Sequence, residues 1–317
     1  MANVVGAGVQ RPTLLDGVTL FAVAALWGAS FLFIRVAVHD LGPVALIEAR
    51  VLLAGLALLA VGALLRRQPA WRRDWKGYLV LGGVSAAAPF TLIAAAELEI
   101  TASLAAILNA TTPLFALLLA AVRLRERLTG RRLSGVLLGV VGVAVLVGAG
   151  PLQLNRGLVL ATAASLLAAL LYAVGGVYAK SRFATTPPLT VATGQQLGAA
   201  ALLLLPTLAL PPPRSPTPSV TAAVLALALA STALGFALFY RLVARLGPTG
   251  ALSVTFLVPV FGLAWGATFL GEQLTPGTGL GLLIVLSSIA LVTDVGRRRP
   301  AQPKYTTRQP NPGTSDP

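Results

Sequence analysis

Few side chains in this 317-residue sequence are able to do chemistry, and most of those lie inside long apolar runs. Eight are candidates to bind a small solute: Trp27, Ser30, Arg50, Asn109, Tyr172, Gln196, Tyr240 and Thr255. Trp27 and Tyr172 are predicted to form an aromatic platform for a flat or apolar group, and Arg50 to meet an anionic group. Two alternatives stay open. Trp and Tyr are often anchors at the lipid interface, and polar side chains often only bond helices together.

An internal repeat marks further candidates. The segment "PLFALLLAAVRLRERLT" (113–129) recurs as "PVFGLAWGATFLGEQLT" (259–275), with eight of the 17 aligned positions identical. Pro113 and Pro259 are retained. A proline inside a helix frees the carbonyl four residues earlier, and here both freed carbonyls belong to residues with polar side chains. We predict a role for both prolines in substrate binding or gating, with a kink that only helps packing as the alternative.

The repeat also retains a glutamate pair, Glu126 and Glu272, each followed by Leu-Thr. Thr275 and Pro276 make a good N-cap and first-turn pair for a helix, and a carboxylate near a helix start is favoured by the positive end of the helix dipole. A structural role is therefore expected for both glutamates, with symmetric latching of gates as the alternative.

Composition excludes several classes of protein. The chain is 56% apolar and only 11% charged, whereas soluble domains carry about 25% charged residues, so its solvent is lipid. It has no cysteine and one histidine, His39, which argues against a zinc site, a histidine-dependent triad or thiolate chemistry. No Walker-type phosphate loop is present. We therefore expect no cofactor, no metal and no catalytic residue.

The long apolar runs predict an all-α membrane protein, because a spanning helix needs roughly 20 mainly apolar residues and the runs lack the alternation of barrel strands. Ten transmembrane helices are expected near 14–38, 43–65, 77–98, 102–122, 132–149, 157–179, 188–209, 220–242, 248–270 and 276–294. The first run has no cleaved-signal pattern before it and is expected to be a retained helix. The proline-rich, polar tail, 295–317, is expected to be disordered.

The basic residues predict the orientation. With a cytoplasmic N-terminus (1–13), 20 of the 24 Lys and Arg residues fall in cytoplasmic segments, so both termini are expected inside. The second repeat starts after five helices and is therefore inverted, which explains why Arg123, Arg125 and Arg127 have no basic counterpart in the second copy. Two inverted five-helix halves, 14–149 and 150–294, predict alternating access with the substrate site near the midplane.

Two contacts follow from this layout. Arg35 and Glu48 lie at similar distances from the turn between the first two helices, and we expect them to form an ion pair. Helices 4 and 5 are expected to pack with helices 9 and 10 as the scaffold between the repeats, because these segments carry the strongest internal likeness and the small residues for close contact.

With these motifs in place, the chain resembles the EamA-type members of the drug/metabolite transporter superfamily. The likeness is carried by "ALWGASF" (25–31), by 113–129, and by the long segment 238–292. The resemblance implies a multi-pass carrier of a bacterial-type inner membrane that exports amino acids, other metabolites or drugs.

A secondary transporter that exports a small organic solute is the leading interpretation. A non-transporting sensor or scaffold is the main alternative, and a membrane-embedded enzyme is a weaker one. The expected partners are a small-molecule substrate and the lipid bilayer, with no nucleic acid, and the sequence does not indicate an oligomeric state.

Overall fold

The structure is a computed structural model that describes residues 13–66, 69–124, 129–148, 154–251 and 253–293. Glu126, most of the N-terminal segment and the tail from 295 lie outside the described residues. The described chain is helical and contains no strand. Its α-helices are α1 (Leu14–Leu64), α2 (Trp71–Gly82), α3 (Ala88–Ala96), α4 (Ala102–Asn109), α5 (Thr112–Leu124), α6 (Gly130–Gly148), α7 (Arg156–Arg182), α8 (Pro188–Ala209), α9 (Pro218–Leu225), α10 (Gly235–Ala251), α11 (Val254–Leu270) and α12 (Pro276–Val292).

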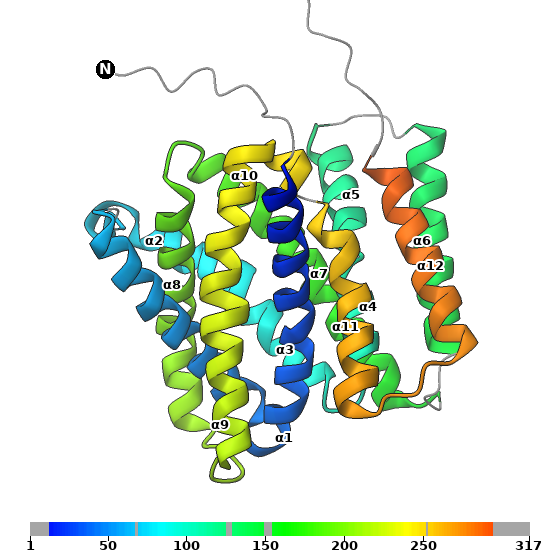
Figure 1. The fold of residues 1–317 in the computed structure, drawn as a ribbon, viewed down its shortest axis with the longest axis horizontal. Coiled ribbons are helices and arrows are strands. Elements are labelled where there is room, and N and C mark those ends of the chain that lie inside the picture. Colours follow the sequence, from blue (N-terminus) through cyan, green and yellow to red (C-terminus); the bar gives the residue numbers. More distant parts are fainter. Residues whose placement is uncertain (1–12, 67–68, 125–128, 149–153, 252, 294–317) are drawn as a thin grey trace, which may run out of the picture.

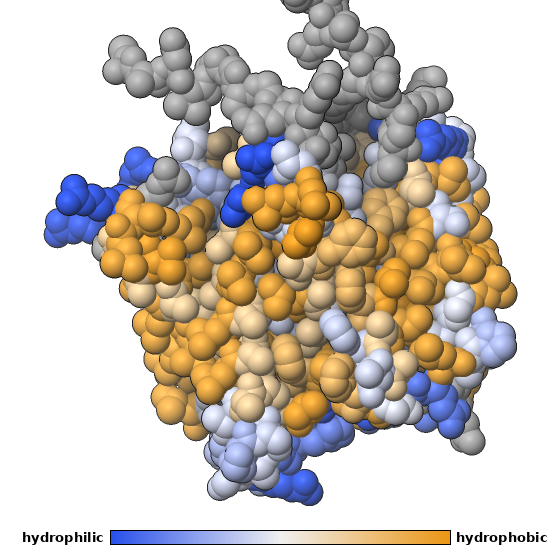
Figure 2. Space-filling model, viewed as in Figure 1, coloured by the Kyte–Doolittle hydropathy of each residue, from blue (hydrophilic) through white to orange (hydrophobic). Residues whose placement is uncertain are grey.

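The helices lie side by side in one bundle (Figure 1). Within the described ranges, seven helical segments are long and apolar enough to cross a membrane, and α11 and α12 are shorter apolar helices. Apolar residues cover the flank of the bundle, whereas hydrophilic residues gather toward its two ends (Figure 2). The chain is thus an all-helical integral membrane protein.

Helix α1 is 51 residues long but is not one rod. Gly42 has φ 71° and ψ 160°, a conformation that residues with a Cβ rarely adopt, and Pro43 follows it. A first limb therefore descends to Gly42 and a second limb runs back toward Leu64 (Figure 1). We call the end where α1 begins the N end, and the opposite one the Gly42 end. The expected turn between the first two helices, 14–38 and 43–65, is confirmed. A second Gly-Pro pair interrupts α10 at Gly247, where φ is 75°.

Two π-helical segments join α-helices: η1 (Gly83–Ala87) joins α2 to α3, and η2 (Ala226–Leu234) joins α9 to α10. The third run is helical from Trp71, six residues before the expected start at 77. The predicted start of this helix is too late because its first residues, "WRRDWK", are polar although they are helical.

The two prolines of the repeat act differently. At Pro113 the helix breaks, and α4 ends at Asn109 while α5 starts at Thr112. The hydroxyl of Thr112 donates to the Asn109 carbonyl at 2.8 Å, so this freed carbonyl is already satisfied by a neighbouring side chain. Helix α11 instead continues through Pro259.

The two halves of the chain pack against each other along several pairs of helices. Glycines on α6 lie against α12, where a Cβ on Gly142 would come within 2.8 Å of Val285. Helix α11 packs on α4 and on the first limb of α1, and the indole nitrogen of Trp265 donates to the carbonyl of Ala25 at 3.0 Å. The expected contacts of α6 with α12 and of α4 with α11 are present, but they are not the whole scaffold, because α1 also packs extensively on α8. This last contact, where Leu197 of α8 fills the space beside Gly55 of α1, was not predicted.

Candidate substrate-binding site

Arg50, on the second limb of α1, is the buried cation of the membrane core. It is 6% exposed, and its Nε donates to the hydroxyl of Thr232 at 3.0 Å. The Thr232 hydroxyl in turn donates to the carbonyl of Leu227, five residues earlier in η2, at 2.7 Å. The guanidinium carbon lies 3.7 Å from the ring centroid of Phe90. Within the described chain its two terminal nitrogens make no hydrogen bond, so they are available to a ligand.

Tyr172 joins this cluster from α7. Its ring packs on Phe90 with 6.0 Å between centroids, so Phe90 contacts both Tyr172 and Arg50. Arg50 and Tyr172 were both predicted from the sequence, whereas Phe90 and Thr232 were not. Apolar runs contain many phenylalanines and threonines, so only the fold distinguishes these two.

Trp27 belongs to a second aromatic cluster. Its ring lies 5.0 Å from that of Phe239 and 5.9 Å from that of Phe236, and Tyr240 stacks on Phe236 at 6.0 Å. Trp27 and Tyr172 therefore pack on different partners and do not form the single platform that was expected from their matching positions. Gly235 makes room for the indole, because a Cβ there would lie 2.7 Å from Nε1 of Trp27.

Other candidates are also held inside the bundle. Gln196 of α8 is fully buried, and neither polar atom of its amide has a partner in the described protein. The Oδ1 atom of Asn109 is likewise buried without a partner. Ser30 is 7% exposed, and Thr255 on α11 is half-buried. Buried amides without partners are costly, so they mark points where a ligand or water gains hydrogen bonds.

Two buried carboxylates stand out among the described residues. Glu97 follows α3 and is fully buried, with no hydrogen-bond partner for either carboxylate oxygen. Glu48 is 7% exposed, and its Oε2 has no partner. Glu97 was not predicted from the sequence, although a carboxylate at the end of an apolar run indicates a candidate functional residue.

The expected ion pair between Arg35 and Glu48 is wrong. Arg35 instead donates through Nη1 to the backbone carbonyl of Glu97. The equal distances of Arg35 and Glu48 from the turn did not decide the contact, because the segment after α3 supplies the acceptor that Arg35 meets.

Glu272 reaches across the two halves of the chain at the Gly42 end. Its carboxylate accepts from the backbone nitrogens of Ala102 at 2.7 Å and Ser103 at 3.0 Å, and from the Ser103 hydroxyl. These are the free amides at the start of α4, where the helix dipole favours a negative charge. The carboxylate therefore caps α4 of the other half rather than the helix that follows it in sequence.

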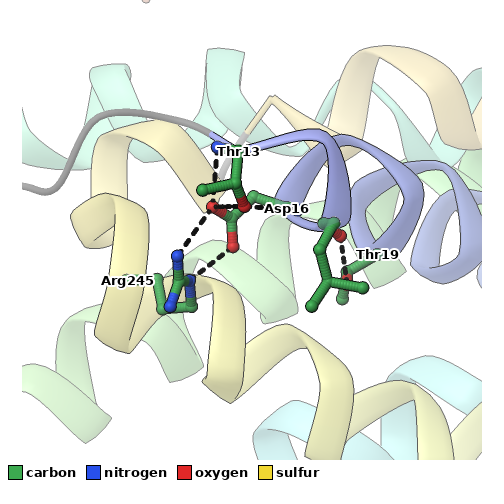
Figure 3. A network of polar contacts seen from close by, with 5 residues as sticks. Thr13, Asp16, Thr19 and Arg245 are labelled. Atoms are coloured by element: carbon green, nitrogen blue, oxygen red, sulfur yellow. Dashed lines mark hydrogen bonds and ion pairs between the residues drawn. The ribbon is translucent and has the colours of Figure 1, made fainter.

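At the N end, Asp16 of α1 and Arg245 of α10 close the bundle (Figure 3). Arg245 donates to the two carboxylate oxygens through Nε at 2.6 Å and Nη2 at 3.2 Å. Thr13 donates its backbone N–H and its hydroxyl to the Asp16 carboxylate at 3.0 and 2.7 Å. The Thr13 hydroxyl oxygen also accepts from the Asp16 N–H at 3.3 Å, which completes a capping box. Asp74 of α2 pairs with Arg182 of α7 at 2.7 Å, so both ion pairs join the two halves.

A family model matches the chain twice, over residues 16–148 and 157–294, and its description is the EamA-like transporter family. The chain belongs to this family. The duplicated match covers nearly all of the described helices, so this family member is a small-molecule transporter of the membrane.

Relatives of this EamA transporter match it along almost their whole length. It is 32% identical over 292 residues to a "Probable terminal-alkyne amino-acid exporter" of Streptantibioticus cattleyicolor, covering 89% of this chain and 95% of that protein. It is 27% identical to a "Probable amino-acid metabolite efflux pump" of Salmonella typhimurium, with 86% and 93% covered. It is also 27% identical to the "Uncharacterized inner membrane transporter YedA" of Escherichia coli, with 90% and 92% covered.

A solved structure of another protein has a similar fold. It superposes with a TM-score of 0.62 at 22% identity, and the match covers 89% of this chain and 97% of that one. At this identity the likeness speaks for the helical arrangement alone.

Proposed function

We propose that this EamA transporter exports a small organic metabolite of the amino-acid type by alternating access, as a secondary carrier. The observation that carries the proposal is Arg50, a desolvated guanidinium with two terminal nitrogens that no described side chain uses. A planar fork of donors in an apolar site is suited to a carboxylate. The names of the exporter and the efflux pump among the relatives point to the same substrate class.

Ten spanning helices in two inverted five-helix repeats account for the architecture. The two limbs of α1 count as two spans, and the broken runs α2–α3, α4–α5 and α9–α10 as one each. Together with α6, α7, α8, α11 and α12 this makes ten. The boundary between the halves is proposed at 149–150, and the two family matches, over 16–148 and 157–294, support it.

The N end is proposed to face the cytoplasm of a bacterial-type inner membrane, with both termini inside. Arg66, Arg72, Arg73, Lys76, Arg131, Arg132, Lys180, Arg182, Arg241 and Arg245 lie toward that end, whereas Arg156 and Arg214 belong to the Gly42 end. The bias of basic residues toward the cytoplasm sets this orientation.

The substrate is proposed to bind between the halves, with its carboxylate at Arg50 and its apolar part near Tyr172. Trp27, Ser30, Asn109, Gln196, Tyr240 and Thr255 are proposed to line the path. Two contacts between the halves, which we call latches, support alternating access. The Asp16–Arg245 ion pair holds the N end together, and the contact of the Glu272 carboxylate with the backbone of α4 holds the Gly42 end together. The break at Pro113 supports a hinge, and Pro259 is proposed to bend in the same way during the cycle.

The test is solute counterflow in proteoliposomes with a panel of L-amino acids that includes L-propargylglycine, which carries a terminal alkyne. The wild-type protein is expected to exchange at least one of them, and Arg50→Gln to abolish the exchange. Arg50→Lys keeps the charge but loses the fork, and is expected to raise the KM about tenfold, which corresponds to about 1.4 kcal/mol.

Arg214→Gln serves as the control, because Arg214 is exposed at the Gly42 end and its loss should leave counterflow unchanged. Counterflow by Arg50→Gln equal to that of the wild type would refute the role of Arg50. The absence of any flux across the panel would refute the substrate class and favour the sensor or scaffold.

A further inference from the structure

A cavity of about 430 Å³ lies beside the Asp16–Arg245 latch at the N end. The first turns of α1 border it on one side, and the segment that leads from the kink of α10 into α11 borders it on the other. Its wall is mostly apolar, and its lining includes Thr13, Asp16, Gly17, Leu20, Leu246 and Ser253. The volume falls within the range of about 300–1,000 Å³ that is typical of small-molecule sites.

The charged groups at this cavity are those of the latch. Asp16 lines the cavity and is 2% exposed, so its carboxylate is almost removed from water. Its Oδ2 atom accepts from Arg245 and twice from Thr13, whereas Oδ1 accepts only from the Nε of Arg245 (Figure 3). Within the described chain the Nη1 atom of Arg245 makes no hydrogen bond, and the side chain is 33% exposed. The latch therefore keeps both an acceptor and a donor for a ligand.

The zwitterion of an amino acid matches these groups. Its ammonium can donate to Oδ1 of Asp16, its carboxylate can accept from the guanidinium of Arg245, and its side chain can pack on the apolar wall. A ligand with only one of the two charges leaves the opposite partner of the latch without a counter-ion, which is costly where water is scarce. The cavity therefore favours a zwitterion over an amine or an acid of the same shape.

We propose that this cavity is the entry site for the exported amino acid, and that the two charges of the substrate replace the Asp16–Arg245 ion pair and open the latch. The inference rests on the proposed function and names the place where the substrate first binds. Because the N end is proposed to face the cytoplasm, a molecule that leaves the cell reaches this cavity before it reaches Arg50. The substrate favours the open latch because only there do both of its charges pair with the protein.

The first measurement places a single thiol in the cavity through Ser253→Cys, since the chain has no cysteine of its own. Ser253 is exposed and its hydroxyl does not cap α11, so this change should leave the fold intact. L-Leucine or L-propargylglycine, at about ten times the half-protecting concentration, is expected to slow maleimide labelling of the purified full-length variant about tenfold, because only empty sites react. Ser181→Cys, also at the N end, is the control, and its labelling should not change.

Changes to the charges identify the groups that bind. In the Ser253→Cys protein, Asp16→Asn and Arg245→Gln are each expected to abolish the protection by L-leucine. Arg50→Gln should keep it, because Arg50 is not part of this cavity. The charges of the ligand are separated in the same way: isopentylamine lacks the carboxylate of leucine and 4-methylpentanoate lacks the ammonium, and neither should protect.

Gly17→Leu tests the cavity while both charges of the latch stay in place. A Cβ at Gly17 meets no atom within 4 Å, so a leucine side chain there takes up space in the cavity without a clash. Protection by L-leucine should be lost and the KM of counterflow should rise, whereas the Tm should not fall, because leucine is a better helix former than glycine. Gly279→Leu is the matched control, since Gly279 lies in the first turn of α12, also with no atom within 4 Å, and should alter neither protection nor KM.

The outcomes separate the entry site from the proposed function. Equal protection by L-leucine, isopentylamine and 4-methylpentanoate, or unchanged protection in Asp16→Asn or Gly17→Leu, would overturn the entry site. Protection that disappears in Arg50→Gln would place its origin at Arg50 and would also overturn it. An amino acid that exchanges in counterflow without protecting Ser253→Cys would refute the entry site and leave the carrier intact. If no amino acid of the panel exchanges, the proposed function fails, and this inference fails with it.

Discussion

At the scale of single residues, the two latches differ in chemistry, and this difference can be measured. The Asp16–Arg245 pair is a charge pair between side chains, whereas Glu272 is held by backbone amides of α4. An ion pair depends on the charge of both partners, and a cap depends only on the carboxylate.

We predict that Asp16 and Arg245 are energetically coupled. Asp16→Asn and Arg245→Gln are each expected to lower the Tm of the detergent-solubilised protein, and the double variant to lower it by less than the sum. The coupling arises because either single change leaves the other charge without its partner at the N end. Asp40 and Arg214 form the reference pair, since they lie 3.5 Å apart with Arg214 75% exposed, and their changes should add. Additive losses for Asp16 and Arg245 would contradict the prediction.

Glu272→Gln is expected to weaken the latch at the Gly42 end. An amide offers one acceptor oxygen and brings donors toward the N–H groups of Ala102 and Ser103, which need acceptors. Hydrogen bonds to charged groups are worth about 1.5–3 kcal/mol, so a loss of this size is expected in unfolding measured by thermal denaturation. Gln273→Ala, a change at the exposed neighbour, should have no effect. Equal stability of Glu272→Gln and the wild type would show that the cap does not hold the Gly42 end.

At the scale of secondary-structure elements, small residues determine which helices pack together. The α6–α12 contact has glycines where a Cβ would meet the opposite helix, and the α1–α8 and α4–α11 contacts follow the same rule. This close approach replaces the hydrophobic driving force that helices lack in lipid.

Gly142→Ala is expected to separate α6 from α12. Its Cβ would lie 2.8 Å from a Val285 methyl and 3.1 Å from the Val285 backbone nitrogen, and the backbone cannot move as a side chain can. Overpacking of this kind costs about 1–3 kcal/mol, which would appear as a lower Tm. Gly130→Ala lies on the same helix with no atom within 4 Å, and should be neutral or slightly stabilising. A similar Tm for both variants would mean that the contact is not tight.

At the scale of the whole molecule, the orientation can be tested directly because the chain has no cysteine. Ser219→Cys lies at the exposed start of α9 at the Gly42 end, and Ser181→Cys near the end of α7 at the N end. In intact cells a membrane-impermeant maleimide is expected to label the cysteine at 219, and to label the one at 181 only after lysis. The reverse pattern would invert the topology and the direction assigned to each latch.

The apolar runs, the basic bias and the repeat determined the class of the protein, the number of expected spans, the family and several polar candidates. They could do so because the need to satisfy backbone hydrogen bonds in lipid forces each long apolar run into a helix. The turn between the first two helices could also be predicted, because the pair Gly42-Pro43 favours a break in the helix.

Only the tertiary structure decided which polar groups meet. The Arg35–Glu48 prediction failed and the link of Glu272 to α4 was not foreseen, because partners come from helices far apart in the chain, and depth in the membrane does not specify which helix faces which. Trp27 and Tyr172 occupy matching positions in the repeats, yet their neighbours differ, because Trp27 packs on Phe236 next to η2 whereas Tyr172 packs on Phe90 of α3. Sequence determines the helices because their hydrogen bonds are local. The site depends on contacts between segments, and those follow from packing.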